Sequence, residues 1–263
     1  MTDQQPFFYA LASGVTAFST TRRGGYSRGA YGEFNINPYC GDDAQAVARN
    51  RLMLSNELRL IGPKRLILPH QSHGTAVRLV DNAFLALSSD SQKALLDNTD
   101  ALLTAEPEVC IGVSTADCIP ILLYDPEHRT AAAVHAGWRG TLKRIAAKAV
   151  EEMVTVFGSR PQALKAVVGP GISLKNFEVG DDVYDLFASE GFDMGRVASR
   201  FGKWHLNLPF LNQLQLEETG MAGTHIQQCG LCTFDQSERF FSARRLGIRS
   251  GRIYTGIVIR NET

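Results

Sequence analysis

The stretch of residues 111–141, IGVSTADCIPILLYDPEHRTAAAVHAGWRGT, is the part of the sequence that most constrains the fold. It contains three short apolar runs that are separated by residues favouring turns. These runs are residues 111–114, 119–124 and 131–134. Short apolar runs between turn-forming residues predict buried strands. On this prediction Cys118 lies at a break between two strands, and His135 lies at the end of a third.

Cys118 and His135 are the most reactive side chains of this stretch. A cysteine thiolate and a histidine imidazole are ligands that zinc prefers. The same two groups also form the nucleophile and the base in enzymes that use a covalent cysteine intermediate. The pattern fits either kind of site and does not choose between them.

Residues 141–157 form the clearest helix of the sequence, because apolar residues recur at helical spacing and Gly158 follows. The helix is expected to begin just beyond residues 138–140. A helix N-terminus carries a positive partial charge and unpaired N–H groups. An anionic substrate group would therefore be favoured near His135.

A second helix is expected to begin after Asp42 or Asp43, which would cap its N-terminus, and to end near residue 60. Its apolar residues repeat at helical spacing. They are Val47, Leu54, Leu58 and Ile61. A further helix is expected after Asn207, with Pro209 in its first turn.

The composition favours one domain over residues 1–263, since 44% of the 263 residues are apolar. Lys plus Arg and Asp plus Glu are equal at 27 each, and there is no basic block, so nucleic acid is not an expected partner. No apolar run approaches the ~18 residues of a membrane helix. With five irregularly spaced cysteines, these features predict a cytoplasmic protein with reduced thiols. The sequence gives no indication of oligomeric state.

Arg22, Arg23, Gly24 and Gly25 place two guanidinium groups beside a backbone that can expose its N–H groups. This combination is typical of an anion or phosphate cradle. A solvated glycine-rich turn between strands has the same composition and is the alternative. The segment lacks the lysine and the spacing of a P-loop, so no nucleoside triphosphate site is indicated.

His70 and His73 lie between a proline and a glycine, which favours a strand or turn over a helix. On a strand their odd spacing would send the two side chains to opposite faces. At most one of them is therefore expected in a common site. No H-E-x-x-H helix is present, so any zinc ligands must be dispersed along the chain.

Five motifs in the same order resemble those of the YfiH-like, laccase-domain family, whose members have been labelled polyphenol oxidases and are associated with purine nucleoside phosphorylase and adenosine deaminase activity. The resemblance extends from residue 18 to residue 252. The motifs are QSHG at 71–74, TADCIP at 115–120, AVHAGWRG at 133–140, Gly169–Pro170 with residues 177–179, and FSARR at 241–245.

The resemblance implies an α+β fold, a single-domain four-layer α/β/β/α sandwich with mixed sheets. It also implies zinc, with copper as the alternative metal, on His73, Cys118 and His135. The family's glycine-rich arginine segment matches residues 21–27, which favours the phosphate interpretation of that segment. Arg139 and Arg244 are further candidates for binding substrate or phosphate.

Two reactions follow from the resemblance. In phosphorolysis, inorganic phosphate attacks C1′ of a purine nucleoside such as adenosine, inosine or methylthioadenosine, which gives the free base and ribose 1-phosphate. In deamination, zinc lowers the pKa of its water to ~7, and hydroxide attacks C6 of adenosine. Cys118, His135 and His73 would carry the chemistry, with Asp117 as a candidate for proton transfer or for support of the ligands.

Three alternatives remain from the sequence. A copper-dependent polyphenol oxidase is disfavoured, because a multicopper site needs more histidines than the six present. A metal-free Cys118–His135 pair would resemble that of toxin deamidases, or of an amidase that edits peptidoglycan precursors, which is the role associated with some bacterial relatives. The third alternative is a zinc-stabilised module that binds a partner without catalysis.

Overall fold

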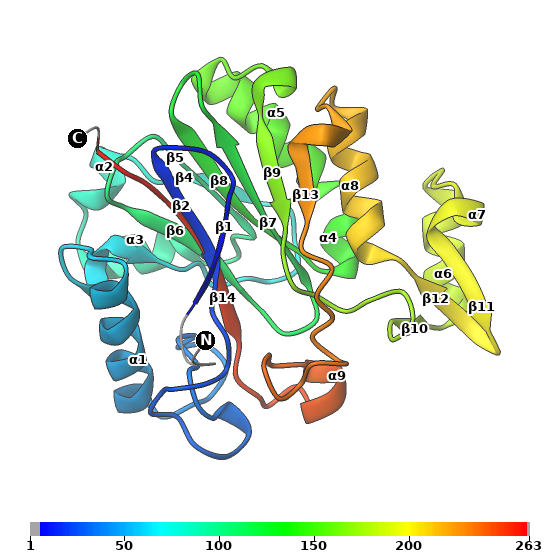
Figure 1. Cartoon of the computed structure of the whole chain (residues 1–263), viewed down its shortest axis with the longest axis horizontal. Coiled ribbons are helices and arrows are strands. Elements are labelled where there is room, and N and C mark those ends of the chain that lie inside the picture. The colour runs from blue at the N-terminus through cyan, green and yellow to red at the C-terminus, as the bar shows by residue number, and fades with distance from the viewer. Residues whose placement is uncertain (1–5, 262–263) are drawn as a thin grey trace.

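Two β-sheets lie face to face at the centre of the molecule, in a computed structural model that describes residues 6–261 (Figure 1). The first sheet has the order β1 (Phe7–Tyr9), β2 (Val15–Ser19), β14 (Ile253–Ile259), β6 (Cys110–Thr115) and β3 (Leu66–Ile67). The second has the order β13 (Ile226–Gln228), β9 (Lys165–Val168), β7 (Ile119–Asp125), β8 (Thr130–Ala136), β5 (Ala101–Thr104) and β4 (Val77–Leu79). Both sheets are mixed, because β3–β6, β13–β9 and β4–β5 are parallel pairs whereas the other pairs are antiparallel.

The apolar core between the sheets explains why the central strands are continuous hydrophobic runs. Ile111, Val113 and Ile257 of the first sheet pack with Leu122 and Ala133 of the second, and all five are fully buried. A strand that is covered on both faces has no solvent side on which polar residues could alternate. The strands predicted at 111–114, 119–124 and 131–134 are confirmed as β6, β7 and β8.

Helices cover the outer faces of both sheets and complete the predicted four layers (Figure 1). α5 (Ile145–Phe157) and α8 (Leu208–Glu218) pack on the second sheet. α1 (Ala44–Glu57) contributes Leu54 to a core that contains Phe18, Cys110 and Tyr254 of the first sheet. The predicted α/β/β/α arrangement is confirmed.

The remaining elements lie around this stack. A small antiparallel sheet of β10 (Glu178–Val179), β12 (Lys203–Leu206) and β11 (Ala198–Phe201) joins α6 (Asp181–Ser189) and α7 (Met194–Val197) beside α8 (Figure 1). The other helices are α2 (Asn82–Leu85), α3 (Ser89–Leu96), α4 (Trp138–Leu142) and α9 (Ala243–Leu246). Within residues 6–261, four 3₁₀ turns lie at Gly29–Tyr31, Pro63–Arg65, Pro161–Ala163 and Gly223–His225.

Two predicted helices differ from the structure in detail. The helix expected at 141–157 is two helices, α4 and α5, because Arg144 takes a left-handed conformation with φ of 59° between them. α1 begins with Asp43 as its N-cap, as expected, but it ends at Glu57, and Ile61 lies beyond it with 83% of its surface exposed. The helix expected after Asn207 is confirmed as α8, which has Asn207 as its N-cap and Pro209 in its first turn.

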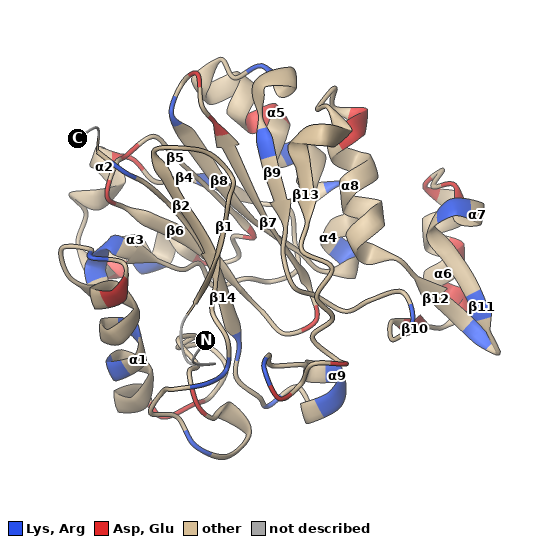
Figure 2. Ribbon diagram, viewed as in Figure 1, with Lys and Arg blue, Asp and Glu red and all other residues tan. Residues whose placement is uncertain are grey.

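Positive and negative side chains are distributed over the molecule in a way that agrees with their equal numbers in the sequence. Lys and Arg are interspersed with Asp and Glu over the elements that Figure 2 shows, without a uniformly basic face in that view. Within residues 6–261, no helix combines the length and the apolar character that crossing a membrane requires.

Candidate active site

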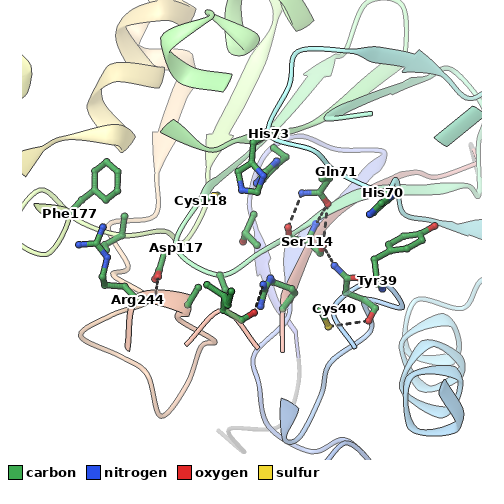
Figure 3. Close-up of a pocket in the computed structure, with 18 residues that line it drawn as sticks. Tyr39, Cys40, His70, Gln71, His73, Ser114, Asp117, Cys118, Phe177 and Arg244 are labelled. Atoms are coloured by element: carbon green, nitrogen blue, oxygen red, sulfur yellow. Dashed lines mark hydrogen bonds between the residues drawn. The ribbon is translucent and has the colours of Figure 1, made fainter. Parts of the chain in front are cut away.

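Three side chains from separate parts of the chain converge at one point of the structure (Figure 3). His73 comes from the loop between β3 and β4, Cys118 from the link between β6 and β7, and His135 from the end of β8. One potential ligand atom from each lies within 4.8 Å of the other two. These are two nitrogens and one sulfur, a donor set that zinc prefers.

The sheet arrangement explains this convergence. β6 belongs to the first sheet and β7 to the second, so the chain crosses between the sheets at residues 116–118. The antiparallel register of β7 and β8 pairs Pro120 with His135, which brings the imidazole beside the crossing point. His135 is therefore inside a strand, and Cys118 is at the predicted break. His73 joins them from a turn in which its φ is 62°.

Asp100 holds two of the three candidate ligands in place. Its Oδ1 accepts a hydrogen bond from His135 Nδ1 at 2.7 Å and one from the N–H of His73 at 3.0 Å. Its Oδ2 accepts one from the N–H of Gly74 at 2.7 Å. Donation from Nδ1 fixes the tautomer of His135 and leaves Nε2 available as a ligand. Asp100 was not singled out from the sequence, so its role was missed.

Gly137 provides the space that the three side chains occupy. A Cβ built on Gly137 would lie 2.8 Å from Cδ2 of His73 and 3.1 Å from Sγ of Cys118. It would also lie 3.7 Å from Cε1 of His135. Contacts below about 3.4 Å are tighter than carbon atoms accept without displacement. Only glycine at this position allows the three ligands to remain where they are.

The electrostatics of the site favour an ionised Cys118. Burial by itself would raise the pKa of the Cys118 thiol, but the charge of His135 and hydrogen bonds from His135 and His73 lower this pKa to about 6. Burial would lower the pKa of His135, but the charge of Cys118 and the hydrogen bond to Asp100 raise it to about 9. A thiolate is the form of cysteine that binds metals and attacks electrophiles.

The three residues line a cavity of about 640 Å³ (Figure 3). This volume is within the ~300–1,000 Å³ range of sites for small organic ligands. The other residues that line it are Asn37, Tyr39, Cys40, His70, Gln71, Ser114, Thr115, Ala116, Asp117, Ile172, Phe177, Ala243, Arg244, Ile248 and Arg252. Of these, Tyr39 and Arg252 were not singled out from the sequence, because only the fold brings them to the same cavity.

Asp117 lies beside Cys118 and both of its carboxylate oxygens accept hydrogen bonds. Oδ1 accepts from the hydroxyl of Thr233 at 2.7 Å, and Oδ2 accepts from the N–H of Arg244 at 2.7 Å. The second of these bonds attaches α9 to the segment that carries Cys118. The geometry of Asp117 therefore suits support of the site better than proton transfer.

The predicted cations fall in different places. Arg244 lines the cavity and directs two guanidinium N–H groups to the carbonyl of Glu178 at 3.1 and 3.2 Å. Arg139 is exposed, and its guanidinium carbon lies 4.2 Å from the ring centroid of Trp138. Arg139 does not line the cavity.

The predicted cradle at Arg22, Arg23, Gly24 and Gly25 is also not among the residues that line the cavity. The Arg22 guanidinium donates to the carbonyls of Gly32 and Ser237. That of Arg23 donates to the carbonyl of Glu238 at 2.7 Å and pairs with its carboxylate at 3.1 Å. The N–H of Gly24 donates to the Glu33 side chain, and a Cβ on Gly25 would collide with the Glu33 carbonyl at 2.3 Å. These contacts are internal to the protein.

The expectation that His70 and His73 would not share a site is wrong. Both line the same cavity, although only His73 joins the Cys118–His135 cluster. The expectation assumed the alternation of an extended strand, whereas neither residue belongs to a strand and the chain turns at His73.

The fold and the site together define a class of protein, a four-layer α+β chain with a Cys–His–His cluster that could hold a metal ion in an open cavity. The model of the family described as multi-copper polyphenol oxidoreductase laccase matches residues 16–260. The chain belongs to this family of enzymes, which confirms the laccase-domain resemblance.

Relatives of known name cover nearly all of the chain. A purine nucleoside phosphorylase of Bacteroides thetaiotaomicron is 43% identical over 250 residues, which are 94% of this chain and 92% of the relative. The adenosine deaminase RL5 from an unknown prokaryotic organism is 41% identical over 253 residues, 95% of this chain and 96% of the relative.

Solved structures confirm the fold. The hypothetical protein YfiH of Bacillus licheniformis superposes with a TM-score of 0.90 at 28% identity, covering 97% of both chains. YlmD from Geobacillus stearothermophilus superposes with a TM-score of 0.89 at 28% identity, covering 96% of this chain and 94% of that one.

Proposed function

We propose that this chain is a zinc-dependent purine nucleoside phosphorylase that also deaminates adenosine. The observation that carries the proposal is the convergence of His73, Cys118 and His135 in a cavity of about 640 Å³. The names of the relatives at 43% and 41% identity support the two reactions. Purine nucleosides and inorganic phosphate would be the substrates.

The residues fit a bound zinc ion in three respects. The donor set is two imidazoles and one thiolate, which leaves a fourth position for water or substrate. Asp100 fixes the His135 tautomer, as carboxylates commonly do for histidine ligands. Gly137 keeps the space beside the ligands free of a side chain. When bound, zinc would act as a Lewis acid and would activate water for deamination.

The cavity would serve phosphorolysis by positioning the two substrates. Arg244 uses two of its N–H groups on the Glu178 carbonyl and retains others for a phosphate oxygen. Arg252 adds a second positive charge to the lining, although its guanidinium donates to the carbonyls of Ser250, Gly251 and Ile248. A phosphate oxygen then forms a bond to C1′ while the bond from C1′ to the purine nitrogen breaks. The electron pair of that bond stays with the base, which takes up the proton that the attacking hydrogen phosphate gives up.

This assignment places the phosphate with Arg244 and Arg252 instead of Arg22 and Arg23. The guanidinium groups of Arg22 and Arg23 already donate to main-chain carbonyls outside the cavity. Asp117 would hold α9 and hence Arg244 next to the Cys118 segment. Positioning and charge stabilisation would thus carry most of the phosphorolysis.

The test is an assay of purified protein of measured metal content with adenosine, inosine and methylthioadenosine. Release of base only when phosphate is present supports phosphorolysis, and release of ammonia from adenosine supports deamination. Cys118→Ala should abolish zinc binding and turnover while the far-UV circular dichroism stays unchanged. Cys229→Ala is the matched control, because Cys229 is also partly buried but does not line the cavity. Full activity of Cys118→Ala would refute the assigned site.

A metal-free Cys118–His135 pair is the second candidate, because the lowered pKa of Cys118 also suits an amidase nucleophile. Iodoacetamide separates the two cases. A zinc-bound thiolate should react slowly with iodoacetamide until a chelator is added, and turnover of nucleosides should follow zinc content. Rapid alkylation of fully active protein, with amide hydrolysis and no nucleoside cleavage, would establish the amidase instead.

A further inference from the structure

One side of the cavity presents two aromatic rings that the proposed chemistry has not used. Tyr39 and His70 both line the cavity, with ring centroids 4.5 Å apart and an interplanar angle of 32°. Figure 3 shows this pair on the side of His73 and Cys118 away from Phe177 and Arg244. Tyr39 is 41% exposed, so an aromatic surface remains open to a ligand.

His70 is held rigidly in this position. Its Nδ1 lies 2.6 Å from Oδ1 of Asp97, and its main chain bonds to Leu96 and Thr99. A carboxylate that accepts from Nδ1 leaves Nε2 free for another hydrogen bond. Among the described residues, neither Nε2 of His70 nor the hydroxyl of Tyr39 has a hydrogen-bond partner in the protein. Two polar atoms of the pair are therefore available to a ligand.

A chain of hydrogen bonds fixes the pair relative to the candidate metal ligands. The N–H of Tyr39 donates to Asn37 Oδ1 at 2.6 Å, and Asn37 Nδ2 donates to the hydroxyl of Ser114 at 2.7 Å. Gln71, two residues before His73, exchanges hydrogen bonds with the main chain of Ser114 at 2.8 and 2.9 Å. The separation between the aromatic pair and His73 is thus set before a ligand binds, which reduces the entropy lost on binding.

The other aromatic residue that lines the cavity is less suited to stacking. Phe177 is only 8% exposed, and the guanidinium carbon of Arg244 lies 5.5 Å from its ring centroid. A planar ligand would have to displace Arg244 to reach the Phe177 face. This side of the cavity carries a cation and suits the anionic substrate.

We infer that Tyr39 and His70 form the subsite for the purine base, with the base stacked on this pair and hydrogen-bonded to His70 Nε2. The inference rests on the proposed function. Phosphate and base must lie on opposite sides of C1′ when one displaces the other. Arg244 on one side of the ligands and the Tyr39–His70 pair on the other provide that order, and the ribose lies between them. Asp97 is a positioning residue that acts through His70.

The test compares Tyr39→Ala and His70→Ala with two controls. His128→Ala removes a histidine that is likewise paired with an aspartate, Asp125, at 2.8 Å and is 40% exposed, but does not line the cavity. Phe201→Ala removes an aromatic ring that is 61% exposed and also lies outside the cavity. The KM for inosine, the KM for phosphate and the zinc content are measured for each variant.

Stacking on an aromatic side chain contributes enough that its loss should raise the KM for inosine about tenfold. The KM for phosphate and the zinc content should change less than about twofold, and both controls should match the parent protein. Equal increases in both KM values, or an unchanged KM for inosine in both site variants, would overturn the base subsite.

Calorimetric binding of free hypoxanthine separates failure of this inference from failure of the proposed function. The parent protein should bind the base, and Tyr39→Ala should weaken binding about tenfold. If the parent cleaves no nucleoside yet shows this difference, the phosphorylase proposal fails and the subsite stands. If the parent cleaves inosine but Tyr39→Ala and His70→Ala bind hypoxanthine as the parent does, the subsite is refuted.

Discussion

At the scale of single residues, the site depends on side chains that do not line the cavity. Asp100 is the clearest of these, because one carboxylate orients His135 and also accepts from the N–H groups of His73 and Gly74. It thereby connects two candidate ligands that are 62 residues apart in the sequence, at positions 73 and 135. One buried carboxylate therefore fixes the positions of the two histidines relative to each other.

Asp100→Asn should weaken zinc binding by about 10–100-fold, the usual effect of removing a carboxylate behind a histidine ligand. An amide has one acceptor oxygen, so it cannot serve His135 and the His73 loop together. Competition with a fluorescent zinc chelator measures the affinity. Asp90→Asn, an exposed residue of α3, is the control and should bind zinc as the parent protein does. Parent-like affinity in Asp100→Asn would contradict this role.

Gly137→Ala tests the space beside the ligands. The new methyl group would lie 2.8 Å from His73 and 3.1 Å from the Cys118 sulfur, so at least one ligand must move. The φ of −69° at Gly137 is allowed for alanine, so the backbone itself is not strained. We expect at least a tenfold loss of zinc affinity with little change in secondary structure.

Gly195→Ala is the control for this substitution, because Gly195 lies in α7 and its nearest neighbour would be Asp193 Oδ1 at 3.3 Å. Zinc affinity, measured by competition, should be unchanged there. A Gly137→Ala protein that retains full zinc affinity would contradict this prediction, because it would mean that the His73 and Cys118 side chains can move without loss of zinc binding.

At the scale of elements, the strands could be predicted and the connections could not. β6, β7 and β8 are apolar throughout because they are buried on both faces, and that pattern is visible in the sequence itself. The interruption between α4 and α5 was not visible, since Arg144 is a good helix former in isolation. Its left-handed conformation instead accompanies contacts with Glu218 of α8 at 2.6 Å and with Phe192.

Some residues of the candidate site could likewise be predicted from the sequence, and others could not. Cys118 and His135 were visible because they lie in or beside strongly apolar strands, and His73 entered through the family resemblance. Asp100 could not be recognised, because its partner His135 lies 35 residues away and the contact depends on β5 pairing with β8. The prediction of a phosphate cradle at Arg22 and Arg23 did not identify residues of the cavity, because both guanidinium groups donate to carbonyls of their own chain. Composition alone cannot distinguish such a guanidinium from one that binds a ligand.

The turn between β7 and β8 carries the next prediction, which concerns pH. Asp125 ends β7, is fully buried, and accepts from the N–H of Glu127 at 2.8 Å and from His128 Nδ1 at 2.8 Å. Burial by itself would raise the pKa of Asp125, but the Ser159 hydroxyl, His128 and the N–H of Glu127 keep it below its ordinary value. The unfolded chain, with a pKa of about 3.9, therefore takes up the proton at a higher pH than the folded chain.

It follows that Asp125 stabilises the fold above pH ~4, and that this contribution is lost as the pH falls through the lower folded pKa. Urea unfolding between pH 6 and pH 3 should show a shallower acid loss of stability for Asp125→Asn than for the parent protein, and Asp125→Asn should be less stable at pH 6. Identical slopes for the two proteins would contradict the assignment.

At the scale of the whole molecule, the candidate metal ligands depend on a framework that is stable without them. The two sheets share an apolar core, and each outer face is covered by helices with apolar cores of their own. None of His73, Cys118 and His135 belongs to these cores. A structural zinc site in a small domain is different, because the metal there supplies most of the folding free energy.

Removal of metal should therefore lower the melting temperature without abolishing cooperative unfolding. A ligand at about 1,000 times its dissociation constant stabilises the folded state by ~4 kcal/mol. For a chain of this size that corresponds to roughly 8–16 °C. Differential scanning calorimetry with and without a chelator measures the shift, and Cys118→Ala should melt at the same temperature in both conditions. If the parent protein with chelator shows no cooperative unfolding transition, the metal is required for folding. If the chelator lowers the melting temperature but the protein turns over no nucleoside, the partner-binding module is favoured over an enzyme.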